Sequence, residues 1–273
     1  MKQRYFNRFL LIYMFFVLSC GQNKPHSAQS NHQDKHFDSS KSDPRAIQVV
    51  DQMWKALGVP DHWEKARYLS FHWIVEREGQ TLADYRHDWD RYTNRYRVEG
   101  KNRAGKHIVA LMNLETKQGQ AFEDGQLVPT DSLSKYINFA YQRFINDSYW
   151  LLMPYKLKDP GVILHYEGEK EEKGQKYDVI KVTFENVGLT PGDTYWAFIN
   201  KQTHLMDKWE YLLQNRQPPP QVAWWENWRD FNGIKLALDR EFEGRPFHIY
   251  FKDVKVSAEV NEQIFRSNMN TIE

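Results

Sequence analysis

Residues 222–242 read VAWWENWRDFNGIKLALDREF, and this stretch decides the fold class. Apolar and polar side chains alternate along residues 222–230 and again along 234–242, which is the period of a β-strand with one buried face. Asn232-Gly233 separates the two segments, and Asn-Gly is a dipeptide that favours the tight turn of a β-hairpin. The stretch therefore predicts two antiparallel strands joined by a hairpin.

The same alternation recurs through most of the chain, in short segments that are separated by turn residues such as Pro and Gly. The further segments are 68–76, 84–90, 95–99, 107–114, 119–123, 162–167, 176–184, 194–200, 206–213 and 247–256. Short strands joined by tight turns predict an antiparallel meander rather than alternating strands and helices. A sheet of about eleven such strands should curl strongly.

Two segments have the period of an amphipathic helix. The first follows Asp43-Pro44, an N-cap residue with Pro at the first helical position, and ends at Gly58. The second runs over about residues 131–145, and residues 149–153 could add one more turn. We therefore expect a mainly β (α+β) domain, in which two or three helices cover a strongly curved antiparallel sheet.

The composition excludes several classes of protein. The chain has 37 Lys and Arg against 36 Asp and Glu, and a net charge of +1 gives no sign of a nucleic-acid partner. A hydrophobic fraction of 41% and an aromatic fraction of 15% are too high for a disordered chain. The single Cys among 273 residues excludes a disulfide framework and a Cys-rich metal site.

The first twenty residues have the pattern of a bacterial secretion signal. Basic residues precede an apolar run of about ten residues, Phe9–Leu18, which is too short to span a membrane. The run is followed by Ser19-Cys20, and a small residue before Cys resembles the lipobox at which lipoprotein signal peptides are cut. We expect residues 1–19 to be removed and Cys20 to be lipidated, which would hold the mature chain in a membrane. An ordinary secretory signal or an uncleaved anchor is the alternative.

Residues 20–43 are polar and contain almost no large apolar side chain, which predicts a flexible tether that begins at the lipidated Cys20. The remaining residues, 44–273, are enough for one domain. Gly21 follows Cys20, with no Asp there, and in the sorting pattern of Gram-negative bacteria that this resembles, such a residue favours the outer membrane. We expect a location in the cell envelope, on the periplasmic side of the outer membrane.

No motif of a familiar catalytic or cofactor site occurs in the sequence: Gly-x-Ser-x-Gly, His-Glu-x-x-His and phosphate-binding loops are absent. The cluster that most resembles a site is His87-Asp88-Trp89-Asp90, but alternation places His87 and the two carboxylates on opposite faces of a strand. We therefore expect no catalytic residue, no metal and no cofactor, and a structural role for His87. If His87 or His72 met a carboxylate and a nucleophile in one cleft, an enzyme would be favoured instead.

Three motifs carry a resemblance to a known superfamily. They are LMPYKLKDPG at 152–161, the segment YDV…VTF within 177–184, and PGDTY at 191–195. Over about residues 46–256 the chain resembles uncharacterised bacterial envelope proteins of the outer-membrane lipoprotein-sorting superfamily, the LolA/LolB-like carriers. The resemblance implies a sheet of about eleven strands wrapped as an open barrel. It also implies helices over the hollow side and a cavity that accepts lipid or the acyl chains of another lipoprotein.

The aromatic content agrees with such a cavity, because 10 Trp, 15 Tyr and 16 Phe could build rigid apolar walls. We expect the cavity to be lined by aromatic side chains from five of the strands. These residues are Trp73, Tyr85, Trp89, Trp196, Phe198, Trp209, Tyr211, Trp224 and Trp228. Ordinary core packing beneath the helices is the alternative for each of them, because alternation fixes which residues share a face but not which face is inside.

These observations predict a membrane-anchored envelope lipoprotein that binds a lipid or an acyl chain, with a role in lipid or lipoprotein handling. We expect it to be a monomer. The alternative is a non-catalytic module that senses or holds another envelope protein or a glycan. Aromatic side chains exposed on the outer surface would favour that alternative, whereas aromatic side chains inside a hollow favour lipid.

Overall fold

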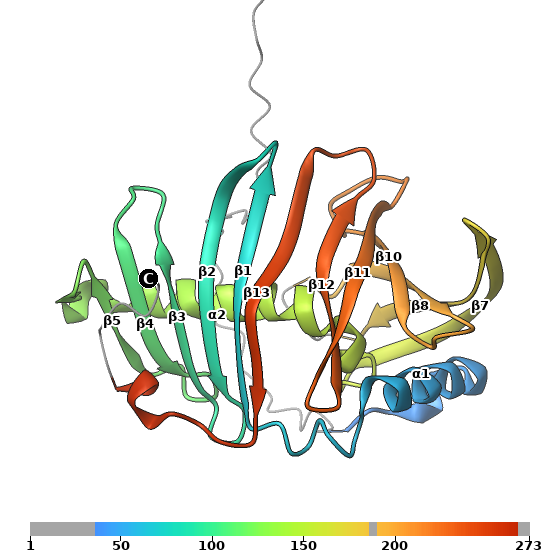
Figure 1. The fold of residues 1–273 in the computed structure, drawn as a ribbon, viewed down its shortest axis with the longest axis horizontal. Coiled ribbons are helices and arrows are strands. Elements are labelled where there is room, and N and C mark those ends of the chain that lie inside the picture. Colours follow the sequence, from blue (N-terminus) through green and yellow to red (C-terminus); the bar gives the residue numbers. More distant parts are fainter. Residues whose placement is uncertain (1–35, 186–189, 267–273) are drawn as a thin grey trace, which may run out of the picture. The chain divides into compact units, whose positions relative to one another are not determined.

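Thirteen antiparallel strands form one sheet in the computed structural model, which describes residues 36–185 and 190–266 (Figure 1). These residues belong to the larger of the chain's two structural units, residues 34–273. The strand order is β6-β5-β4-β3-β2-β1-β13-β12-β11-β10-β9-β8-β7. Strands that follow one another in the chain are therefore neighbours in the sheet, except β6 and β7, and β1 pairs with β13. The sheet is open, because β6 and β7 are its two edges.

The mainly β class and the curved open sheet are confirmed, with thirteen strands in place of about eleven. The strands are β1 (Tyr68–Arg77), β2 (Gln80–Asp90), β3 (Arg95–Lys101), β4 (His107–Asn113), β5 (Gly119–Glu123), β6 (Gln126–Leu127), β7 (Val162–Glu172), β8 (Gln175–Phe184), β9 (Thr194–Asn200), β10 (Met206–Leu212), β11 (Gln221–Phe231), β12 (Ile234–Phe242) and β13 (Phe247–Ser257). The helices are α1 (Pro44–Leu57) and α2 (Thr130–Leu152), with short 3-10 turns η1 (Ser39–Lys41), η2 (Met153–Lys156) and η3 (Glu262–Phe265).

Helix α1 begins and ends where the sequence predicts, but its N-cap residue, Asp43, does not cap the helix with its side chain. Gly58 ends the helix in the left-handed conformation, with φ of 91°. Asp43 makes no side-chain cap, because its carboxylate accepts a hydrogen bond from the backbone N–H of Tyr166 at 2.8 Å. The Asp43 N–H in turn donates to the Leu164 carbonyl oxygen at 2.9 Å. Asp43 therefore fastens the start of α1 to the edge strand β7.

Helix α2 is one continuous helix of 23 residues that runs across one face of the sheet (Figure 1). We name the face that packs against α2 the inner face and the opposite one the outer face. The sequence predicts a helix over about residues 131–145 and one more turn over 149–153, whereas α2 continues without interruption from Thr130 to Leu152. The helix continues because the Asp147 carboxylate, which is fully buried, has partners on the helix and on the sheet.

The main core lies between the inner face and the helices, and a small second cluster lies on the outer face. The outer cluster consists of Tyr177, Val179 and Phe198, with Trp196 packed against it. In the part of the chain that the structure describes, no helix has both the length and the apolar character to cross a membrane. Cys20, the signal segment and the tether up to residue 35 lie outside the described residues.

Candidate functional site

The inner face gathers most of the aromatic residues that the sequence predicts for a cavity. Trp73, Tyr85, Trp209 and Tyr211 are buried in the main core, and Trp89 is half-buried against it. Trp89 meets Phe144 of α2 edge to face, with ring centroids 4.9 Å apart. Trp228 of β11 is also half-buried against this core.

The expectation that all nine residues line one face needs a correction for three of them. Trp196 and Phe198 of β9 and Trp224 of β11 belong to the outer face. Their neighbours Tyr195, Ala197 and Trp225 occupy the inner positions. Adjacent residues of a strand point to opposite faces, so in Trp224-Trp225 either Trp could have been the one that faces inward. The binding role of the six remaining residues stays a prediction.

Trp209 is the centre of the inner aromatic cluster. Its ring stacks on Trp150 of α2 with centroids 4.9 Å apart, and it contacts Tyr195 edge to face at the same distance. Tyr149 of α2 and Trp225 of β11 lie at centroid distances of 5.7 and 5.8 Å. Trp209 thus joins three strands to the C-terminal part of α2.

Five buried indole N–H groups in this region have no hydrogen-bond partner among the described residues. They belong to Trp73, Trp89, Trp209, Trp225 and Trp228. A buried donor without an acceptor costs about 1–3 kcal/mol, and buried Trp usually finds a partner. A cluster of such donors is an unfavourable choice for a core that only has to be filled, whereas it suits a surface that receives oxygen atoms from a ligand.

A buried polar cluster links α2 to the sheet beside these aromatic residues. The His87 ring lies 2.6 Å from the Tyr96 hydroxyl through Nδ1 and 3.1 Å from the Asp147 carboxylate through Nε2. Arg143 donates to the same carboxylate at 2.7 Å through Nε, and its guanidinium lies over the rings of Trp73 and Tyr85. The sequence predicts a structural role for His87 but does not reveal its partner. The i, i+4 spacing of Arg143 and Asp147 could have predicted the ion pair between these two residues, but not the contact of Asp147 with His87.

The environment shifts two of these groups in a defined direction. Burial lowers the pKa of His87 below its usual 6.5, which favours the neutral imidazole. Burial alone would raise the pKa of Asp147, but Arg143 and His87 outweigh it and the net pKa is lowered. The cluster is therefore a carboxylate held by a guanidinium and a neutral imidazole.

Two of the pockets formed by the described residues lie away from the inner site, since no residue of α2 or of the pair His87 and Asp147 lines either of them. One has a volume of about 180 Å³ on the outer face, over β1, β2 and β13. The other, of about 290 Å³, is more open and lies over β3 to β5 beside Phe265. Helix α2 and the aromatic residues pack together on the inner side, and His87 is only 1% exposed there.

A buried arginine closes the C-terminal end of α2. The Arg240 guanidinium, fully buried, donates to the Trp150 carbonyl oxygen through Nε at 3.0 Å and Nη2 at 2.6 Å. It also lies 3.5 Å from the centre of the Trp225 ring. Carbonyl groups at a helix C-terminus carry partial negative charge, so this contact is favourable and fixes that end of the helix.

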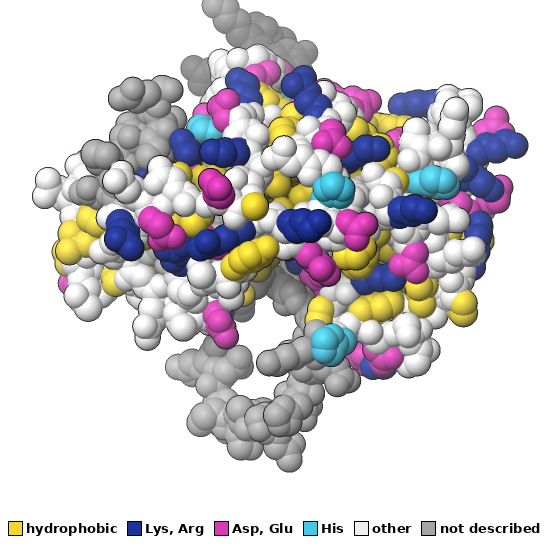
Figure 2. Space-filling view, turned by 60° about the horizontal axis from the view of Figure 1, so that its bottom comes forward, with side chains coloured by type: hydrophobic (Ala, Val, Ile, Leu, Met, Phe, Trp, Pro, Cys, Tyr) yellow, Lys and Arg dark blue, Asp and Glu magenta, His cyan; other side chains and the backbone are white. Residues whose placement is uncertain are grey.

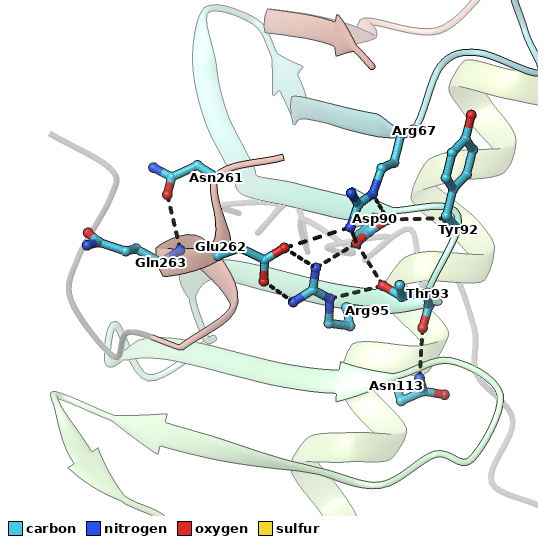
Figure 3. Close-up of polar contacts among 9 residues, drawn as sticks. All are labelled: Arg67, Asp90, Tyr92, Thr93, Arg95, Asn113, Asn261, Glu262 and Gln263. Atoms are coloured by element: carbon cyan, nitrogen blue, oxygen red, sulfur yellow. Dashed lines mark hydrogen bonds and ion pairs between the residues drawn. The ribbon is translucent and has the colours of Figure 1, made fainter. Parts of the chain in front are cut away.

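The carboxylates that neighbour His87 in sequence point away from it, as alternation predicts. Asp88 accepts from Arg86 at 3.2 Å and from the Tyr68 hydroxyl, on the outer face. Asp90 accepts from Arg67 and Arg95 (Figure 3). His72 pairs with Asp84 at 2.9 Å. Within residues 36–185 and 190–266, no group of three or more His, Cys, Asp or Glu side chains is placed to hold a metal.

The charged side chains of the surface are mixed in sign. On the face shown in Figure 2, basic and acidic side chains are interspersed, and neither sign forms a field of its own. This distribution is in keeping with the net charge of +1. A long polyanion such as a nucleic acid would find no continuous basic surface on this face.

Comparisons with known proteins find one family whose model matches the chain and several solved structures of low sequence identity. No curated protein matches the chain. Solved structures that resemble it include a DUF1329 family protein from Desulfovibrio piger (12% identity, TM-score 0.47) and a LolA superfamily protein from Nitrosomonas europaea (11%, 0.47). A third is an outer-membrane lipoprotein-sorting protein domain from Vibrio parahaemolyticus (9%, 0.46). Each match covers 81% of this chain and 96% of the other. A family model described as a family of unknown function, DUF6503, matches residues 74–236, and since this is more than half of the sequence, the chain belongs to that family.

Proposed function

We propose that the chain is a non-catalytic envelope lipoprotein, anchored through Cys20, that binds an amphipathic lipid or acyl chain between the inner face and α2. The observation that carries the proposal is the set of five buried indole N–H groups without acceptors among the described residues, on an aromatic face. An apolar chain would pack on the rings, and ester or carboxylate oxygens would accept from the indoles. A purely hydrocarbon ligand would leave the same donors unpaired.

The way α2 is held suggests how a ligand enters. Five of its seven buried residues lie at positions 147–152, and only Ile137 and Ala140 are buried in the preceding seventeen residues. The C-terminal end is also fastened by Arg240 and by the pair of Asp147 with His87. The N-terminal part is therefore the part that can lift at the lower free-energy cost, because less apolar surface is exposed when it moves.

A matched pair of substitutions tests the binding site. We expect Trp89→Phe to weaken the binding of palmitate, used as the probe, by about tenfold, because Trp89 lies beneath Phe144 in the part of α2 that can lift and the change removes one donor to the ligand while an aromatic ring remains. Trp224→Phe is the control, since Trp224 lies on the outer face and its Nε1 already donates to Glu243 at 2.7 Å. Calorimetric titration of both variants measures the difference. Equal affinities in the two variants, or no binding by the wild-type chain, would contradict the proposed site.

A substitution at Cys20 tests the anchor separately. We expect Cys20→Ser to move the protein from the membrane fraction to the soluble fraction of the cell envelope, because no acyl chain can then be attached. Immunoblotting of the separated fractions measures the shift, and Ser19→Ala, which keeps a small residue before Cys20, serves as control. Retention of the Cys20→Ser protein in the membrane would mean that another element anchors it.

A further inference from the structure

The smaller pocket, of about 180 Å³, is built from strands that lie far apart in the sequence. Tyr68, Ser70 and His72 of β1 and Arg86 of β2 line it together with Asp253 and Lys255 of β13. Glu259, Asn261 and Ile264, which follow β13, complete the wall. None of these residues belongs to the inner face, so a ligand in this pocket is independent of the proposed lipid site.

The floor of this pocket is held rigidly by a buried carboxylate. Asp88 is fully buried and accepts hydrogen bonds from the Tyr68 hydroxyl and from Nε of Arg86, the latter at 3.2 Å. Burial and the neighbouring Asp88 raise the pKa of Tyr68, so its hydroxyl stays protonated and continues to donate. The Tyr68 ring and the Arg86 guanidinium are therefore fixed before any ligand arrives.

A β-bulge shapes the side of the pocket. Ser70 pairs with Lys255 but His72 pairs with Lys252, so β13 has one extra residue between these pairs. Asp253 lies in this bulge with φ of 50°, in the left-handed region that only a few per cent of non-Gly residues adopt. Bulges commonly redirect a side chain beside a functional site, and Asp253 lines the pocket.

The C-terminal wall is fastened by a network of charges (Figure 3). Glu262 accepts from Arg95 through both carboxylate oxygens, at 2.5 and 2.9 Å, and lies 3.7 Å from Arg67. Asp90 also binds these two arginines. The Asn261 side chain accepts from the Gln263 N–H at 3.1 Å, which orders the turn η3. The wall is thus held in place without any contribution from a ligand.

The lining of the pocket carries charges of both signs. Lys255 supplies a cation and Asp253 and Glu259 supply two carboxylates, while the Arg86 guanidinium already pairs with the buried Asp88. In the described part of the chain, Lys255, Asp253 and Glu259 form no ion pair, so they are available to a ligand. A site that offers carboxylates and a cation side by side suits a neutral ligand that donates and accepts hydrogen bonds at several points.

We propose that this pocket binds one neutral hexose-sized sugar, either free or as the terminal residue of a glycan. Carboxylates accept from vicinal hydroxyl groups, and the Lys255 and Asn261 side chains donate to them. The volume equals that of about six water molecules at roughly 30 Å³ each, which suits a single sugar ring and is too small for a drug-sized ligand.

Saturation-transfer NMR on the full-length chain, in a detergent without a sugar headgroup, tests this site. Methyl glucoside is the neutral probe, with glucuronate and glucosamine as its anionic and cationic counterparts. We expect saturable binding of methyl glucoside, and a loss of about tenfold in affinity in Asp253→Asn, because Asn tolerates the left-handed backbone but removes the charge on the acceptor. A maltotetraoside with a blocked reducing end distinguishes the two forms: equal binding assigns a terminal glycan residue, and binding of methyl glucoside alone assigns a free sugar.

Asp124→Asn is the matched control, since Asp124 also has a left-handed φ, of 49°, and its side chain accepts from the His107 N–H outside this pocket. Lys255→Met provides a second variant in the pocket if Asp253→Asn does not fold. We expect it to lower the affinity for methyl glucoside by a similar factor. The proposal is overturned if methyl glucoside does not bind saturably or if glucuronate or glucosamine binds tenfold more tightly. It is also overturned if neither pocket variant differs from Asp124→Asn.

Discussion

Trp209→Ala should lower the free energy of unfolding by about 3–5 kcal/mol, which is the usual cost of truncating a large buried aromatic side chain. The Trp209 side chain is only 3% exposed and contacts aromatic rings from β9, β11 and α2. Its removal leaves a cavity at the point where α2 joins the sheet, and the rigid neighbouring rings can fill that cavity only in part. Urea denaturation followed by circular dichroism measures the change.

Trp196→Ala is the control for this prediction. Trp196 is half-buried on the outer face, so its truncation should cost about 1 kcal/mol and leave the contacts of α2 intact. Equal losses in the two variants would mean that the inner cluster does not carry the stability that its packing implies. A change in the urea dependence of either variant would indicate a changed denatured state, and the comparison would then be made by calorimetry.

Asp147→Ala should cost about 3 kcal/mol, because it leaves the half-buried cation of Arg143 and the buried ring of His87 without their shared partner. Arg143→Met removes the cation instead and leaves the fully buried Asp147 carboxylate without its charged partner, so a comparable loss is expected although the Met side chain can still pack on Trp73 and Tyr85. Urea denaturation at pH 7 measures both. A loss below about 1 kcal/mol for Asp147→Ala would contradict the buried ion pair.

The same cluster predicts how stability depends on pH. The folded-state pKa of His87 is lowered, so below about pH 6.5 the unfolded chain binds a proton that the folded chain does not. The free energy of unfolding should therefore fall as the pH drops from about 7 to about 5. The lowered pKa of Asp147 adds a loss only below about pH 4, where the unfolded carboxylate takes up its proton. His87→Phe, whose ring can keep the stack on Phe71, should show a weaker dependence over the same range than the wild type when both are denatured in urea at each pH.

Helix α2 is the first place where local patterns and the folded chain disagree. Local patterns predict a helix over about residues 131–145 and one more turn over 149–153, yet α2 continues through Asn146, Asp147 and Ser148. The partner that makes this possible, His87, lies sixty residues earlier on β2. A pairing at that distance leaves no trace in local periodicity, whereas the i, i+4 arrangement of Arg143 and Asp147 does.

The outer pocket is the second place where local sequence patterns do not predict what the folded chain contains. His72, Arg86 and Asp253 come from three strands, and the closing pair of β1 with β13 brings together segments about 180 residues apart. The bulge at Asp253 changes the register by one residue, whereas alternation predicts one regular strand over residues 247–256. A site of this kind was therefore outside the reach of sequence patterns.

The sequence by itself determined twelve of the thirteen strands, the two helices and the antiparallel class, because period, turn residues and caps are local properties that each segment carries alone. The open form of the sheet was implied only by the resemblance to the lipoprotein-sorting superfamily. It also predicted that Asp88 and Asp90 point away from His87, which follows from strand alternation. Only the tertiary structure decided that Trp225 faces inward and Trp224 outward, that α2 fills the inner side, and that Asp147 meets His87. The physical reason is that a strand fixes only relative faces, and the choice between them is made by what the other elements bury.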